Sequence, residues 1–539
     1  MRYYDLVIVG AGPAGLALAH TSSSLYRRIL IIDKETEIGG CHRVKRNTDG
    51  LFTEHGPRIY MSLYYNFFNL MEEMGLKRDD VFVKYKYSFL DVANSKILPH
   101  YTFYELMIFT LTYLMFVIDD DYGKDISLYE YLRGYGFSLK VIDIFDRMCR
   151  FTDGGNVYTY SLNKILKITD NIPMLKIYQP NAPLDILLFS TWKRFLSNRG
   201  VDFMLGFGII DYDIQNNNVE TVTLSNSEKI RCGKLVFAVP PVALLNIIKY
   251  ERELRNAFGN YNDIERWAEK TRYIDYISIT YHFKEDKHLP TINGLTFDTD
   301  WGIVFINLSD YMDNVDNSSD AGIIDNAGII DNMSNSRDSR DSRDSRDSRD
   351  SQRYTYDASE TDEAREALYV AKGQPTVLSV AVSICDKNSR VTYKKANESS
   401  ADEIIKEVHR QIKESVFPNL TDDYKAIINP NNYYDPVKNK WACKDNAYFN
   451  VYSEKYIPFN SGINNLYNLG THNGKSYISY TTIESAVSNA IYLAGELYPE
   501  VVSKYTIYRG ITGKNIIMVI IIIMAGILFY FLAYNRGSR

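Results

Sequence analysis

The chain has 539 residues, of which 45% are hydrophobic and 24% charged, so it can bury a large core and form more than one domain. Its net charge of -6 gives no basic footprint, and nucleic acid is not an expected partner. The cysteines lack C-x-x-C spacing, so they indicate neither a disulfide framework nor a zinc site, and we expect no metal: Cys41, Cys149, Cys232, Cys385 and Cys443.

The first motif is a strand, a glycine-rich turn and a helix. Residues 5–9 read as a buried parallel strand that runs into G-x-G-x-x-G spacing over residues 10–15. Glycines at these positions let the backbone approach a diphosphate, which the free amides at the start of the helix would bind. The sequence therefore predicts a dinucleotide site whose contacts include Gly10, Gly12, Pro13, Ala14 and Gly15.

A second apolar strand, residues 29–32, ends in Asp33 and Lys34. A carboxylate about 20 residues past the glycines accepts the hydroxyls of an adenosine ribose and disfavours a ribose 2′-phosphate, so NADP is not expected. Gly39 and Gly40 follow at once. They would let the chain pass close to the diphosphate and ribityl of a flavin.

These motifs, together with residues 52–58, resemble those of the flavin-containing amine oxidase and protoporphyrinogen oxidase superfamily. The resemblance implies FAD as the cofactor, and we expect it to be bound noncovalently. It also implies that Gly56, Pro57 and Arg58 reach the flavin ring, and that Ile209 contacts the adenine through its backbone.

The last flavin segment resembles the superfamily in residues 465–487, a strand that ends at Gly470 and a helix that follows. The resemblance implies that Thr482 and Ile483 present their amides to the pyrimidine end of the flavin, where they stabilise negative charge on the reduced ring. The acid that often follows the glycine in this family is replaced by residues 471–472, Thr-His. The ribityl contact of that acid is therefore in doubt.

The expected fold class is α/β: a discontinuous Rossmann-type FAD domain, a substrate domain with a mixed sheet and helices, and a C-terminal transmembrane helix. Residues 276–283, 301–308 and 377–384 should be strands of one sheet, and residues 401–417 an amphipathic helix. The predicted order is a first FAD-binding segment (1–90), a helical substrate or entrance region (91–190), a second FAD-binding segment (191–245), the substrate domain (246–440) with a disordered low-complexity insert (313–353), a third FAD-binding segment (441–498) and the transmembrane helix (516–534).

Two apolar stretches bear on membranes. Residues 106–118 are too short to span a bilayer, so a buried or an interfacial helix is expected there. Residues 516–534 are uncharged and long enough to cross a hydrocarbon core. They predict a single-pass tail anchor to a lipid membrane, with the catalytic portion in the cytosol.

The substrate side is the least defined region. Amine oxidases place a lysine near flavin N5, and an alignment on Lys284 puts Ser278 at that position, which argues against amine oxidation. Arg58 could instead bind a substrate carboxylate, or pair with Glu54 or the cofactor phosphate. Cys443 lies too early to tether the flavin. The catalytic candidates are Arg58, Ser278 and Tyr448.

The leading hypothesis is a membrane-anchored FAD oxidoreductase. It would move hydride to flavin N5 from a C–N or C–C bond of an amine or a hydrophobic, porphyrinogen-like small molecule, with oxygen or a quinone as electron acceptor. Two alternatives stay open: a flavin-dependent nucleotide-sugar mutase of the UDP-galactopyranose type, and a non-catalytic flavoprotein.

Overall fold

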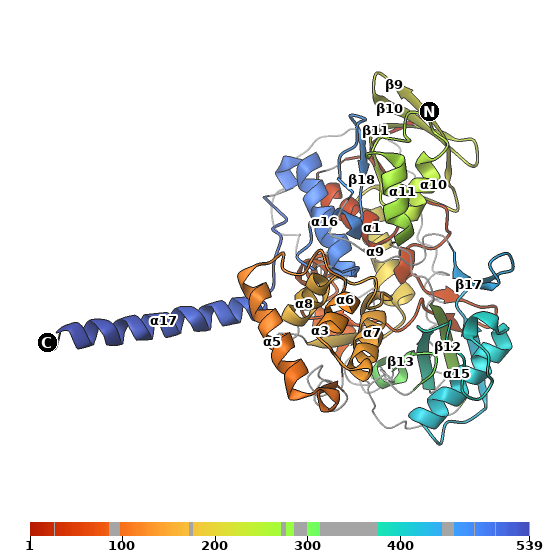
Figure 1. The fold of residues 1–539 in the computed structure, drawn as a ribbon. Helices are drawn as coiled ribbons and strands as arrows, with labels where there is room; N and C mark the ends of the chain where they lie inside the picture. Colours follow the sequence, from red (N-terminus) through yellow and green to blue (C-terminus); the bar gives the residue numbers. More distant parts are fainter. Residues whose placement is uncertain are drawn as a thin grey trace, which may run out of the picture.

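The computed structural model describes residues 1–25, 27–85, 97–171, 176–270, 276–284, 299–312, 376–444, 457–478, 480–501 and 503–537 (Figure 1). The predicted low-complexity insert, residues 313–353, and the catalytic candidate Tyr448 lie outside these residues. The predicted domain boundaries stay predictions.

Seven of the described strands form one sheet in the order β8-β2-β1-β11-β10-β9, with β18 also pairing with β11. The pairs that join β8, β2, β1, β11 and β18 are parallel, whereas β9 and β10 form the antiparallel meander expected before β11. The strands are β1 (Arg2–Val9), β2 (Ile29–Asp33), β8 (Val201–Leu205), β9 (Ile209–Gln215), β10 (Asn218–Leu224), β11 (Lys229–Phe237) and β18 (Leu466–Asn468).

Helices cover both faces of this sheet, because its central strands are apolar on both sides. Leu6 and Ile8 of β1 pack in the core that also contains α1 (Pro13–Ser23), α9 (Ser190–Asn198) and α16 (Ile483–Leu497). Val7 points to the opposite core, which contains α10 (Pro241–Ile248) and α11 (Tyr261–Lys270). The mixed, helix-covered sheet is the α/β nucleotide-binding architecture predicted from the sequence.

A second sheet has the order β13-β14-β12-β15 and forms the other end of the body (Figure 1). Each pair of neighbours in it is antiparallel, so the expectation of a mixed sheet here was wrong. Its strands β12 and β14 are buried on both sides, which gives the continuous apolar pattern usual for parallel strands. The elements are β12 (Ile277–Phe283), β13 (Ile303–Asn307), β14 (Thr376–Val382), β15 (Tyr424–Ile428) and the covering helix α15 (Ala401–Ser415).

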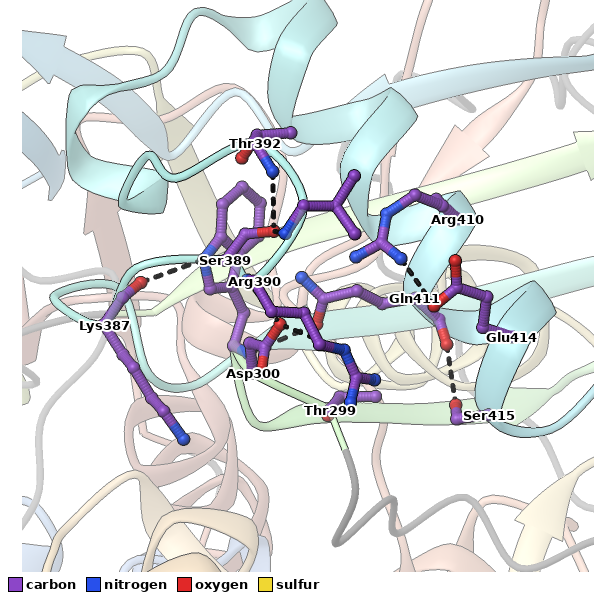
Figure 2. A network of polar contacts seen from close by, with 12 residues as sticks. Thr299, Asp300, Lys387, Ser389, Arg390, Thr392, Arg410, Gln411, Glu414 and Ser415 are labelled. Carbon is purple, nitrogen blue, oxygen red and sulfur yellow. Dashed lines mark hydrogen bonds and ion pairs between the residues drawn. The ribbon is translucent and has the colours of Figure 1, made fainter.

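A polar network fixes α15 to the loop that follows β14 (Figure 2). Trp301 donates its indole N–H to the Lys387 carbonyl at 3.0 Å and its backbone N–H to Gln411 Oε1 at 3.2 Å. Arg390 donates its backbone N–H to Asp300 Oδ2 at 2.9 Å. The hydrogen-bonding groups of these residues pair with one another across the edge of the sheet. We therefore assign the network a structural role.

The helical block packs a core of its own beside the cavity described below. Its helices are α5 (Phe103–Ile118), α6 (Leu128–Gly134), α7 (Leu139–Asp153) and α8 (Leu162–Asn171). Ser127 and Glu130 cap α6 as the sequence predicts. Further described elements are α2 (Tyr65–Glu73), α3 (Arg78–Val81), α12 (Ser309–Met312), β3 (Lys45–Arg46), β4 (Phe52–Thr53), β5 (Tyr60–Met61), β6 (Phe82–Lys84), β7 (Ile177–Pro180), β16 (Asn432–Asp435) and β17 (Lys440–Cys443).

The C-terminal helix α17 (Gly513–Gly537) projects away from the body next to α5 (Figure 1). Within the described residues no helix combines the length and apolar character that crossing a membrane requires. The prediction that residues 516–534 span a membrane is therefore not supported.

Candidate functional site

One cavity of about 670 Å³ lies between the nucleotide-binding sheet and the substrate domain. Its walls come from the N-terminal motif, the β9–α10 region and the segment around the start of α16. These are the three separated stretches of the chain that the sequence assigns to FAD binding. The substrate end is lined by α7, by Ile306 of β13 and by Tyr276, which directly precedes β12.

The glycine turn places the start of α1 in this cavity. Gly10 has φ +115°, and any side chain there would overlap the Ala238 carbonyl oxygen. Gly15 does not line the cavity; it lets α1 pack on the turn, because a Cβ there would meet the Gly10 carbonyl. Gly12 caps α1 without a side-chain hydrogen bond, so the first amides of the helix are left for a ligand. Gly10, Gly12, Pro13 and Ala14 line the cavity.

Asp33 ends β2 at the same edge of the sheet. Its Oδ2 accepts the Ala11 backbone N–H at 2.7 Å and its Oδ1 accepts that of Glu35 at 2.9 Å. Burial raises the pKa of Asp33, and these two hydrogen bonds oppose the rise. The carboxylate is thereby fixed with Lys34 and Ile209 around the end of the cavity where an adenosine would lie.

The second glycine pair closes over the first motif. A Cβ on Gly40 would lie 2.9 Å from the Gly12 Cα, so the two backbones touch where a diphosphate would pass. The Gly39 backbone N–H donates to the Ala11 carbonyl at 2.8 Å, which holds this approach. Gly40 lines the cavity, while Gly39 lies behind it against Phe189.

The start of α16 reaches the opposite end of the cavity. Thr482 is the N-cap, and its Oγ1 accepts the Ser485 backbone N–H at 3.0 Å. Thr482 and Ile483 line the cavity, as does Gly470, two residues after the end of β18. The positive end of the helix dipole thus points into the cavity, where it would favour an anionic group.

Unsatisfied polar groups face the same space. The hydroxyls of Thr471 and Thr481, both cavity-lining residues, are buried without a hydrogen-bond partner among the described residues. His472 next to them is fully buried, donates its Nε2–H to Asn468 Oδ1 at 2.7 Å, and has its pKa lowered by burial to about 3. It is therefore neutral, and Thr471 takes the place of the acid that the family resemblance implies. Polar atoms left in this way fit a polar cofactor.

Gly56, Pro57 and Arg58 form the wall next to the substrate end. The Arg58 guanidinium donates to the Cys41 carbonyl, and its backbone carbonyl accepts from Gln179 at 2.6 Å. Burial raises the pKa of Glu54 to about 7, although the Arg58 charge opposes the rise. Arg58 therefore lies at the junction of cofactor and substrate spaces with its position fixed on both sides.

The structure separates Ser278, another catalytic candidate, from the cavity. Ser278 is fully buried, donates its hydroxyl to the His55 carbonyl, and is not among the lining residues. Tyr276, two residues earlier, lines the cavity instead, and its hydroxyl lies against Gly56. Tyr276 was not predicted from the sequence. An alignment on Lys284 indicates which face of the strand points toward the site, but it does not show which end of the strand lies at the cavity.

Two cysteines lie near the site. Cys443 is half-buried, does not line the cavity, and its sulfur is 3.4 Å from Asn432 Nδ2. Cys41 does line the cavity, directly after Gly40. Its place after the glycine pair could have indicated this from the sequence. No cluster of potential metal ligands occurs in the described portion of the chain.

Comparison with known families gives a local match at the N-terminus. A family model described as an NAD(P)-binding Rossmann-like domain matches residues 8–74. A UDP-galactopyranose mutase from Mycoplasma genitalium is 41% identical over 59 residues, which are 11% of this chain and 15% of that protein. The chain thus matches only a small portion of that relative.

Solved structures match nearly the whole chain. An oxidoreductase from Methanosarcina mazei has a TM-score of 0.57 at 12% identity and covers 90% of this chain and 99% of its own. A putrescine oxidase double mutant has a TM-score of 0.56 at 12% identity (92% and 99%). A cyclohexylamine oxidase from Brevibacterium oxydans has 0.54 at 11% identity (92% and 99%). The predicted resemblance is confirmed at the level of the fold.

Proposed function

We propose that this chain is an FAD-dependent oxidoreductase that takes a hydride from a C–N or C–C bond of a small molecule. The observation that carries the proposal is the meeting of two helix N-termini and the Asp33 carboxylate in one cavity. The start of α1 suits a diphosphate, Asp33 suits a ribose, and the start of α16 suits the electron-rich end of a flavin.

When bound, the flavin would supply the hydride acceptor, and the protein would hold the substrate against it and exclude water. Gly10, Gly12, Asp33 and Gly40 would hold the nucleotide. The amides of Thr482 and Ile483 would favour negative charge on the ring. Noncovalent attachment belongs to the proposal, because Cys443 lies away from the cavity; release of the flavin by acid precipitation tests it.

The substrate end favours a hydrophobic molecule. Its wall contains Phe151, Ile306 and Tyr276, while Arg58 supplies a fixed positive charge at the boundary with the cofactor space. An apolar substrate that carries a carboxylate would satisfy both features, and a porphyrinogen-like compound has this chemistry. Oxygen or a quinone would then take the electrons. We further propose a membrane as the place of action, with the catalytic portion in the cytosol.

The test begins with the absorption spectrum of the purified full chain, which should show bound oxidised flavin. Anaerobic addition of porphyrinogens, amines and UDP-sugars in turn should bleach that band only with the class that is oxidised. A colourless protein that does not take up added FAD would refute the proposal. Flavin that no reductant bleaches would instead identify a non-catalytic flavoprotein.

One observation favours a second candidate, a nucleotide-sugar mutase. A UDP-galactopyranose mutase is 41% identical to this chain over 59 residues. Such an enzyme would need flavin that is already reduced and would convert UDP-sugar without net oxidation. Product formation with dithionite-reduced protein, and no consumption of an electron acceptor, would select this activity.

A further inference from the structure

Helix α5 carries an apolar face that nothing described covers. Five large apolar side chains recur at intervals of four, four, three and four residues and are 41–83% exposed: Phe103, Met107, Leu111, Leu114 and Ile118. This spacing places them along one side of the helix. Tyr104, Leu106 and Met115 are also exposed and widen the strip. An outward face of a helix in water is normally polar, so this face requires an explanation.

The opposite face fixes the helix to the body. Glu105 accepts the Ser138 backbone N–H at 2.7 Å, Thr112 is hydrogen-bonded to the Tyr131 hydroxyl at 2.6 Å, and Phe116 packs in the core of the helical block. A capping box formed by Thr102 and Glu105 fixes the first turn. The exposed face is therefore held in one orientation.

Helix α17 begins next to α5. The Asp170 carboxylate accepts the Lys514 backbone N–H at 2.5 Å and the hydroxyl of Tyr113, a residue of α5, at 2.6 Å. From there α17 extends away from the body (Figure 1). Residues 518–521 are apolar, consecutive and 43–55% exposed. Because each residue turns a helix by about 100°, four in a row expose apolar surface on every side of α17.

We infer that the exposed face of α5 contacts a membrane lipid surface, with α5 lying in the plane of the interface. The occupant follows from the neighbouring helix. A second copy of the chain could cover the strip on α5 but would leave the other sides of α17 in water, whereas lipid covers both. Residues 119–121 are three aspartates directly after Ile118, and they mark where the chain returns to water. The inference does not require α17 to span the membrane.

A tryptophan placed on the strip tests the contact in the full chain. Leu111→Trp replaces an exposed apolar residue, and Lys406→Trp places the same probe on an exposed position of α15, away from α17 (Figure 1). Both variants are mixed with phosphatidylcholine vesicles whose acyl chains carry bromine, a quencher of tryptophan emission. The unaltered protein supplies the baseline of the four native tryptophans.

We expect emission from residue 111 to shift to shorter wavelength and to be quenched by the brominated lipid, and emission from residue 406 to be unchanged. Co-sedimentation with vesicles without quenching at residue 111 would overturn the inference and leave α17 as the contact. Absence of co-sedimentation would also overturn it. A dimer in analytical ultracentrifugation that shields residue 111 without vesicles would replace lipid with a second copy. The flavin spectrum reports separately on the proposed oxidoreductase.

Discussion

The Glu484 carboxylate accepts a hydrogen bond from the Asn66 side-chain amide at 2.5 Å, which joins the first turn of α16 to α2. Asn66 also donates to the Tyr508 carbonyl at 3.1 Å and accepts the Tyr508 backbone N–H at 2.9 Å. One buried amide therefore connects the helix that faces the cofactor space, the helix beside it and the segment that leads to α17.

Replacing this amide should destabilise the protein. Asn66→Ala leaves the buried Glu484 carboxylate with fewer donors and frees the segment at Tyr508, so we expect a loss of about 2–3 kcal/mol in the free energy of unfolding. Urea denaturation measures it. Asn69→Ala is the matched control, because Asn69 lies exposed on the same helix and should change stability little. Equal effects of the two variants would contradict the assigned role.

The Asp33 carboxylate should determine cofactor affinity. Asp33→Asn keeps the shape but replaces one acceptor oxygen with a donor that cannot receive a ribose hydroxyl or the Ala11 amide. We expect the Kd for FAD to rise by about tenfold or more, measured by quenching of flavin fluorescence. Asp211→Asn, on the exposed side of β9, should leave it unchanged. Unaltered affinity in Asp33→Asn would place the ribose elsewhere.

A proline at the first position of α16 should remove a single amide. Proline is tolerated at that position, and the preceding Thr482 has the extended backbone that proline requires. Ile483→Pro should therefore fold yet shift the flavin midpoint potential by about 10–30 mV to more negative values, since the reduced ring loses a donor. Ile483→Ala loses the side chain but keeps the amide. If both variants shift the potential equally, the amide has no such role.

The turn at Gly10 should not tolerate a side chain. Gly10→Ala combines an unfavourable positive φ with an overlap against the Ala238 carbonyl, so we expect loss of FAD binding and a lower Tm. Gly134→Ala is the control, since a Cβ at Gly134 meets no atom within 4 Å. That variant should fold with unchanged cofactor content. Normal FAD binding by Gly10→Ala would argue against the tight turn.

The buried carboxyl of Glu54 should make stability depend on pH. Its pKa is raised by burial from 4.5 to about 7, so the folded protein binds the proton more tightly than the unfolded chain. The free energy of unfolding should then fall as pH rises from about 4.5 to 7, by up to about 3 kcal/mol from this group. Glu54→Gln should reduce that slope in urea titrations of flavin-free protein. An unchanged slope would indicate that Glu54 is ionised in the fold.

Features with local causes could be predicted from the sequence. The glycine turn, the apolar strand before it and the carboxylate after β2 are contiguous motifs whose spacing reflects backbone geometry. The start of α6 likewise follows from Ser127 and Glu130 three residues apart. The strands β12, β13 and β14 were recognisable as one sheet from their apolar runs.

Features that depend on distant partners could not be predicted. Ser278 and Tyr276 lie on the same face of an extended segment, because side chains alternate, and only the tertiary arrangement shows that Tyr276 is at the cavity. The apolar sequence of α5 reads the same whether its outer face is covered or exposed. The antiparallel pairing in the second sheet could not be predicted for a related reason. β12 and β14 are buried on both faces, so they lack the alternation of apolar and polar residues that is typical of antiparallel strands.

The order in which the nucleotide-binding sheet is assembled has a consequence for biosynthesis. The last residues of β11, Leu235 to Phe237, pair with β18, a strand that the ribosome produces only after the whole substrate domain. Until then the growing chain carries an unpaired strand edge and an incomplete cofactor cradle, a state prone to aggregation. Nascent chains that end before β18 should therefore depend on chaperones and should not retain FAD.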